Sequence, residues 1–278
     1  MSVSPLEAPR PFGLRQYLIC LQGIVWRESL RFLHQRERFV SALVRPLVWL
    51  FIFAAGFRQT LGISIIPPYE TYVLYEVFIT PGLMAMIQLF NGMQSSLSMV
   101  YDREMGSMRM LLVSPAPRWF LLTSKLIAGV AVSILQVYAY LVIAYFWEIE
   151  PPTWWGYLTV LPALALSGLM LGALGMVLSS LIKQLENFAG VMNFVIFPMF
   201  FASSALYPLW RVREGSPWLA TVCELNPFTH AVELIRFAFY QKIEPVSLAV
   251  VVGCTVVFLA AAVFAYDPAR GMLMRRGG

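Results

Sequence analysis

Six apolar runs alternate with short polar stretches along the chain, and each run is long enough to cross a bilayer as a helix. About 20 apolar residues suffice for one crossing. The runs cover residues 39–57, 73–100, 121–147, 154–181, 188–206 and 246–266. This pattern predicts an all-α integral membrane protein with six transmembrane helices. The first run contains Arg45, which we expect to extend toward the near interface.

A basic segment precedes the first run. Between residues 14 and 38, apolar side chains recur at helical spacing, and five arginines lie among them. This composition is typical of an amphipathic helix in the interface of an anionic leaflet. A soluble helical arm is the alternative. We therefore predict a tail and interfacial helix over 1–38, a transmembrane domain over 39–266 and a basic tail over 267–278.

Four polar residues follow one face of the second run. Gln88, Asn91, Ser95 and Ser98 are three, four and three residues apart, which places them on one side of a helix. Polar side chains inside a bilayer rarely face lipid, so we expect the stripe to face protein or water. Two interpretations remain open. The stripe makes interhelical hydrogen bonds that only fix packing, or it lines a path through the membrane or a face toward a second copy.

The fourth run carries small residues at intervals that allow helix backbones to approach closely. Gly168 and Gly172 form G-x-x-x-G, and Gly175 with Ser179 repeats the spacing. We expect this helix to pack closely against a neighbour.

The longest stretch outside the runs, residues 207–245, is predicted to lie outside the membrane. Asn226-Pro227 is typical of an N-cap followed by the first residue of a helix. In that helix Glu233 and Arg236 are three residues apart, a spacing at which their side chains can pair.

A charged island, residues 101–120, separates the second and third runs. Its Met and Leu residues recur at helical spacing, and most of its charged residues fall elsewhere around the helix. Pro115 and Pro117 then prevent the helix from continuing. The island is either a loop against the lipid headgroups or a docking helix for a cytosolic partner.

The composition supports a membrane protein and argues against other classes. The 278 residues are 59% hydrophobic and 13% charged, with a mean hydropathy of +0.70, whereas soluble domains carry about 25% charged residues. Three distant cysteines and two histidines on opposite sides of the membrane offer no disulfide framework or metal site. The basic residues flank apolar runs and form no nucleic-acid module.

Positive charge is distributed unequally across the predicted membrane. Six crossings place both termini on one side, and 15 of the 20 Lys and Arg residues lie on that side. Cytoplasmic segments carry the excess of positive charge. Both termini and the charged island are therefore predicted to be cytoplasmic.

The segment D-R-E-x-G-x-x-x-x-L-L-x-S-P-x-x-R, from Asp102 to Arg118, resembles the first cytoplasmic loop of ABC-2 type exporter permeases. The resemblance extends over nearly the whole chain. It includes YEVFITPGLMAM at 75–86, FPMFFASSALYP at 197–208 and the L-N-P-x-T segment from Leu225, with Arg236 after it. The drug and nodulation-factor exporters look most similar, and the ending YDPARG is similar to permeases linked to alcohol catabolism.

The resemblance implies that the island is a coupling helix seated in a cleft of a separate ATPase subunit. The residues that it assigns to this contact are Asp102, Arg103, Glu104, Met105, Gly106 and Arg109. It also implies a permease homodimer with two ATPase subunits in a bacterial cytoplasmic membrane. Such assemblies export lipids, lipid-linked glycans or amphipathic drugs.

The chain itself lacks G-x-x-x-x-G-K-S/T, the loop that cradles nucleotide phosphates. ATP and Mg²⁺ are therefore expected in the partner ATPase, and no cofactor in this chain. Two other classes stay open. An integral membrane enzyme would need convergent acids, histidines or a Ser/His arrangement at one depth, which the sequence does not show. A non-transporting scaffold would need neither the docking helix nor the polar stripe.

Overall fold

The computed structural model describes residues 13–34, 36–57, 67–104, 117–182 and 185–265. Within these ranges the chain is helical and contains no strand. The helices are α1 (Leu14–His34), α2 (Arg36–Phe57), α3 (Tyr75–Glu104), α5 (Arg118–Tyr145), α6 (Gly156–Leu181), α7 (Leu185–Phe201), α8 (Leu209–Gly215), α9 (Pro217–Leu225), α10 (Pro227–Phe239) and α11 (Pro245–Ala265). The all-α prediction is confirmed.

Each predicted apolar run coincides with a helix. Three of these helices, α5, α6 and α11, are long and apolar enough to cross a membrane. The chain is therefore a multi-pass membrane protein. Six spans require that α2, α3 and α7 also cross the membrane. This part of the expectation stays a prediction.

Two helix boundaries differ from the sequence-based expectation. The basic helix predicted over 14–38 ends at His34, and α2 begins at Arg36. The fifth run, predicted over 188–206, ends as a helix at Phe201. In the turn that follows, the Ser203 hydroxyl donates to the Phe200 carbonyl (2.6 Å) and accepts from the Ala205 N–H (3.2 Å). A serine side chain thus takes over local hydrogen bonds that would otherwise continue the helix.

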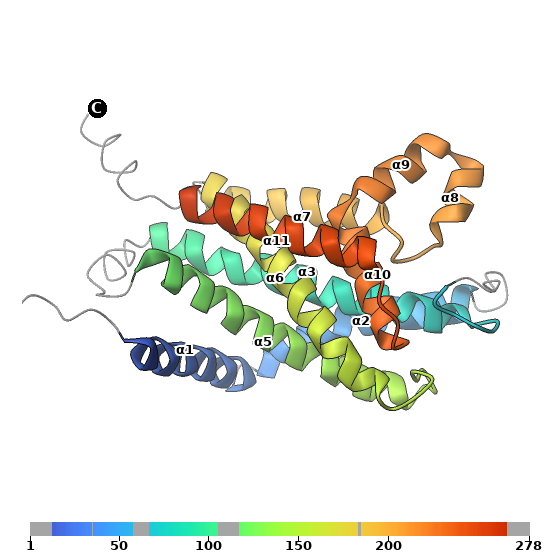
Figure 1. Cartoon of the computed structure of the whole chain (residues 1–278), viewed down its shortest axis with the longest axis horizontal. Helices are drawn as coiled ribbons and strands as arrows, with labels where there is room; N and C mark the ends of the chain where they lie inside the picture. Colours follow the sequence, from blue (N-terminus) through green and yellow to red (C-terminus); the bar gives the residue numbers. More distant parts are fainter. Residues whose placement is uncertain (1–12, 35, 58–66, 105–116, 183–184, 266–278) are drawn as a thin grey trace, which may run out of the picture.

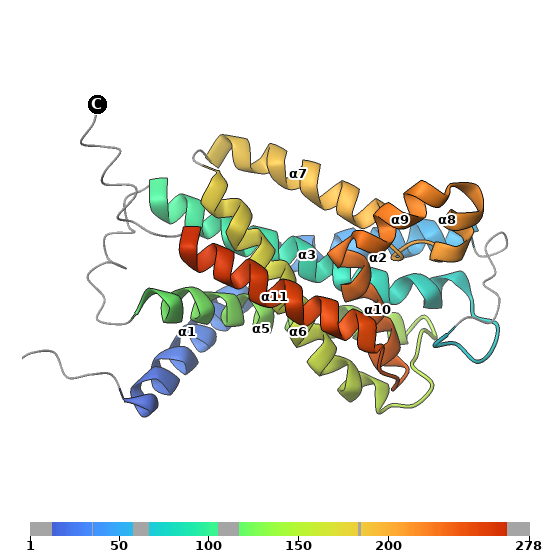
Figure 2. The ribbon, with the colours of Figure 1, turned by 45° about the horizontal axis from the view of Figure 1, so that its top comes forward.

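The long helices lie side by side along the long axis of the molecule (Figure 1). The helix α1, the end of α3, the start of α5 and the end of α11 lie at one end, and α8, α9 and α10 gather at the other. Figure 2 shows that α1 runs at an angle to the bundle. This orientation suits a helix that lies in the interface, a location that stays a prediction.

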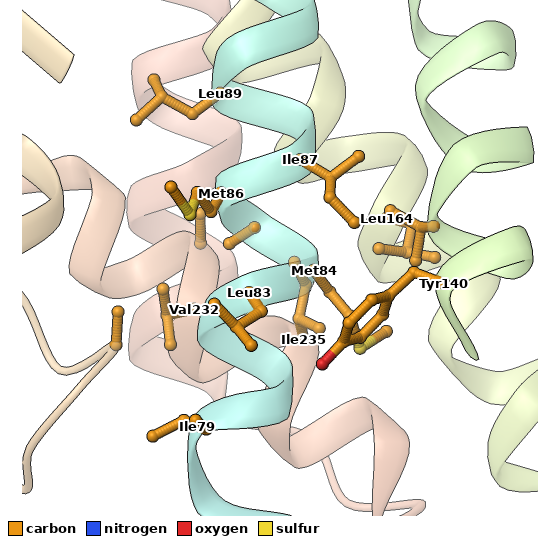
Figure 3. Packing of buried hydrophobic residues seen from close by; sticks show 14 of the residues in the cluster. Ile79, Leu83, Met84, Met86, Ile87, Leu89, Tyr140, Leu164, Val232 and Ile235 are labelled. Carbon is orange, nitrogen blue, oxygen red and sulfur yellow. The ribbon is translucent and has the colours of Figure 1, made fainter. Parts of the chain in front are cut away.

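The helix α3 lies at the centre of the core. Every residue from 78 to 89 is buried, which requires neighbours on all sides of the helix. Figure 3 shows this stretch between Tyr140 of α5 and Leu164 of α6 on one side and Val232 of α10 on the other. Any polar residue on this part of α3 must therefore find its partners within the protein.

The helix α1 is attached to the bundle at the start of α5. The Tyr17 ring packs edge-on against Phe120, with ring centroids 4.8 Å apart, and lies 6.4 Å from the ring of Trp119. These two aromatic residues belong to the predicted coupling loop, residues 101–120. The N-terminal helix therefore contacts the point at which that loop enters α5.

Candidate functional site

The predicted polar stripe on α3 is directed into the chain, toward α5 and α6. The Gln88 amide donates to the Leu164 carbonyl (2.6 Å), and the Ser167 hydroxyl donates to the Gln88 side-chain oxygen (2.6 Å). Gln88 is 1% exposed and Ser167 is 0% exposed. The Gln88 side chain therefore links α3 to α6 at full burial, where an unpaired amide would be costly.

One turn further along α3, Asn91 links the helix to α5. Its amide donates to the Ile87 carbonyl of its own helix (3.0 Å) and to the side-chain oxygen of the buried Gln136. Ser95 faces the same neighbour, because a Cβ atom built on Gly129 would lie 3.0 Å from the Ser95 hydroxyl. The side chain of Ser98 lies outside the described residues. We call Gln88, Asn91, Gln136 and Ser167 the polar seam.

The contacts of the polar seam match the packing interpretation of the stripe. A cavity of about 20 Å³ lies beside Gln88 and Ser95, between α3, α5 and α6. A single water needs about 10–15 Å³, so this cavity has room for about one water. A role in a substrate path or a dimer face stays a prediction.

The glycines of α6 bring its backbone against α3, which confirms the predicted close packing. A Cβ atom on Gly175 would lie 2.8 Å from the Gly92 carbonyl oxygen, and one on Gly92 would lie 3.0 Å from the Gly172 Cα. A Cβ atom on Gly168 would lie 3.2 Å from the Gln88 side-chain nitrogen. Gly92 was not among the predicted packing residues, although Gly92-x-x-x-Ser96 has the same small-residue spacing as the glycines of α6.

A second polar cluster lies around Arg236 of α10, at the end of the bundle where α8, α9 and α10 gather. The guanidinium pairs with Glu233, which confirms the expected pair, and donates to the Ser204 carbonyl (2.7 Å). Its central carbon lies 4.2 Å from the centroid of the Phe78 ring. Arg236 is 3% exposed. We call Arg236, Glu233, Ser204 and Phe78 the Arg236 cluster; it joins α10, the turn after α7 and the start of α3.

Burial and charge act in opposite directions on Arg236. Burial favours the neutral form, but the Glu233 carboxylate and the Tyr69 hydroxyl outweigh it and raise the pKa of Arg236 above its usual value. Burial also raises the pKa of Tyr240 to about 12, against the opposing effect of Arg236. Arg236 therefore stays positively charged near neutral pH, and the Tyr240 hydroxyl near it stays protonated.

Asn226 caps α10 as predicted. Its side-chain oxygen accepts from the Phe228 N–H (3.0 Å), and Pro227 is the first helical residue. The Asn226 amide also donates to the carbonyls of Met199 (2.7 Å) and Ala202 (2.6 Å). The cap therefore ties α10 to the end of α7, a role that the local sequence pattern does not reveal.

The predicted coupling residues are described only in part. Asp102, Arg103 and Glu104 form the last turn of α3, but their side chains lie outside the described residues. Met105, Gly106 and Arg109 lie wholly outside them. Their contact with an ATPase subunit stays a prediction.

Known proteins are similar to this chain over most of its length. The family described as ABC-2 type transporter matches residues 20–240. A protein named transport permease from Cyanophora paradoxa is 28% identical over 204 residues, 72% of this chain and 67% of that protein. A protein named multidrug ABC transporter permease from Escherichia coli is 29% identical over 171 residues, 60% of this chain and 45% of that protein. Nodulation protein J from Rhizobium leguminosarum bv. trifolii is 34% identical over 83 residues, 30% of each chain.

Proposed function

The chain belongs to the ABC-2 type transporter family, and we propose that it is the permease subunit of an ATP-driven exporter. In this proposal a separate ATPase supplies the energy, and an amphipathic or lipid-like cargo moves outward. The observation that carries the proposal is the family match over residues 20–240. That range includes the polar seam, the Arg236 cluster and the whole predicted coupling loop.

An amphipathic cargo is the proposal that the relatives favour. One relative is named as a multidrug ABC transporter permease and another as nodulation protein J. The chain also has no loop for binding nucleotide phosphates in its printed sequence. A permease without that loop depends on a partner for ATP hydrolysis, so the proposal includes two ATPase subunits and a pair of permeases.

The proposed orientation places α1 and the coupling loop at the cytoplasmic face of a bacterial inner membrane. Excess Lys and Arg at that end support it. Large apolar side chains such as Phe194 of α7 and Phe264 of α11 are 82% and 78% exposed. A membrane protein covers such side chains with lipid or with a second subunit, which suits the proposed assembly.

Charge inversion at Glu104 tests the coupling part of this proposal. We expect Glu104→Arg to lower the ATPase rate of the purified complex to that of the ATPase alone, because it reverses charge on the proposed contact with the partner. The permease variant should remain folded, as judged by its unfolding midpoint in detergent.

Glu214→Arg on α8 provides a matched control, because it inverts an exposed charge at the opposite end of the bundle. This control should keep the wild-type ATPase rate. Full stimulation by the Glu104→Arg permease would contradict the assignment of the coupling residues.

A further inference from the structure

A cavity of about 110 Å³ lies between α2 and α3, on the side of Asn91 that faces α2. Its lining is Arg45, Pro46, Met86, Ile87, Phe90, Asn91 and Gln94. One water needs about 10–15 Å³, so this cavity is several times larger than the space for one water. The Arg45 and Gln94 side chains are exposed, so the cavity is open to the surroundings of the chain.

Arg45 brings a positive charge into the predicted membrane region. Its guanidinium carbon lies 3.8 Å from the centroid of the Phe90 ring. Phe90 is 14 residues from the end of α3, about 21 Å along the helix axis. Among the residues that the structure describes, no hydrogen bond or ion pair to this guanidinium is found. Charged groups at membrane depth are costly and usually face a cavity or a partner, so they mark candidate functional sites.

Among the described side chains, none offers a carboxylate to the Arg45 guanidinium. Within the six predicted apolar runs the sequence contains one acidic residue, Glu76, which lies in the first turn of α3. It is 14 residues, about 21 Å, from Phe90. A second copy of the chain has the same sequence and brings no further acid to this depth. An anion that pairs with Arg45 at this depth would therefore belong to another molecule.

The other side chains that line the cavity indicate the chemical groups of that molecule. Both amide donors of Asn91 have partners within the chain, at Ile87 and Gln136. The polar contacts left for a ligand are the Arg45 fork and the Gln94 amide, which suit the oxygens of a phosphate or carboxylate. Pro46, Met86 and Phe90 supply an apolar wall beside them.

We infer that this cavity binds the anionic headgroup of a membrane amphiphile, with Arg45 as the recognising residue. The headgroup belongs either to a resident lipid or to the cargo. The second case rests on the proposed function and would define the cargo as an anionic amphiphile.

Native mass spectrometry of the full-length chain in detergent tests the binding. The probes are dioleoyl-phosphatidylglycerol and, as its uncharged counterpart, dioleoyl-phosphatidylcholine. We expect the wild-type chain to prefer phosphatidylglycerol, and Arg45→Gln to weaken this binding by about tenfold or more, because it removes a charge-assisted hydrogen bond. Arg45→Lys keeps the charge but loses the planar fork, and should fall between the two.

Arg211→Gln is the matched control. Arg211 is exposed on α8 and lies over the Trp210 ring, so this variant removes the same charge far from the cavity and should bind like the wild type. Equal binding of both lipids, or equal losses in Arg45→Gln and Arg211→Gln, would overturn the inference. So would efficient disulfide crosslinking between two copies of the Arg45→Cys variant, which would assign the face to a subunit contact.

The ATPase rate of the complex distinguishes the two sources of the headgroup. Dodecyl phosphate that accelerates ATP hydrolysis with wild-type permease, but not with Arg45→Gln, assigns the cavity to cargo. Binding without acceleration assigns it to a resident lipid. Because the binding assay needs no ATPase, its result stands even if the proposed exporter function fails.

Discussion

Replacing Gly175 with leucine is expected to abolish accumulation of the folded protein. A Cβ atom at this position would already lie 2.8 Å from the carbonyl oxygen and 3.1 Å from the carbonyl carbon of Gly92. These are backbone atoms of α3, which cannot turn aside as the end of a flexible side chain can. We expect a loss of more than about 4 kcal/mol, an exceptional value for one substitution. Expression followed by size-exclusion chromatography measures it.

The smaller variant Gly175→Ala should remain folded and lose about 1–3 kcal/mol, as is usual when extra atoms enter a packed core. Gly253→Ala on α11 is the control, because no atom lies within 4 Å of the added Cβ position. It should be neutral or slightly stabilising, since alanine favours a helix over glycine. Normal yields of Gly175→Leu would show that α3 and α6 are not in backbone contact.

Replacing Arg236 with methionine is expected to have the second largest effect. Methionine keeps an apolar contact with Phe78 but leaves Glu233 and the Ser204 carbonyl without their partner. Breaking a buried ion pair costs about 3 kcal/mol, and this should lower the unfolding midpoint in detergent by about 6–12 °C. A differential scanning fluorimetry series measures this shift.

Arg213→Met is the control for Arg236→Met. Arg213 pairs with Glu224, but its side chain is 64% exposed, and exposed ion pairs contribute about 0–1 kcal/mol. The control should therefore hardly shift the midpoint. A similar shift in both variants would mean that the buried Arg236–Glu233 pair stabilises the protein no more than an exposed ion pair does.

Local patterns could be predicted from the sequence. The Asn226 cap needs only its own helix, and the Glu233–Arg236 pair needs one helical turn. The six apolar runs matched helices because apolar length is a property of each segment.

Long-range contacts could not be predicted in the same way. The polar stripe indicated that Gln88 faces protein, but its partner Ser167 is 79 residues away. Likewise, Arg236 reaches the Ser204 carbonyl, 32 residues earlier in the chain. Spacing defines which side of a helix a residue occupies, whereas tertiary packing decides which helix lies there. Arg45 is similar: its sequence position suggests extension to the interface, and its contact with Phe90 appears only in the fold.

The central claim, that this chain is a permease driven by a separate ATPase, is tested most directly by isolating the chain with its partners. The full-length chain would be tagged in its native host, extracted in mild detergent and analysed by quantitative mass spectrometry. The proposal predicts an ATPase with the phosphate-binding loop, in equal numbers with the permease and depleted by Glu104→Arg. A chain that is recovered alone from several detergents and after crosslinking in the intact membrane would contradict it.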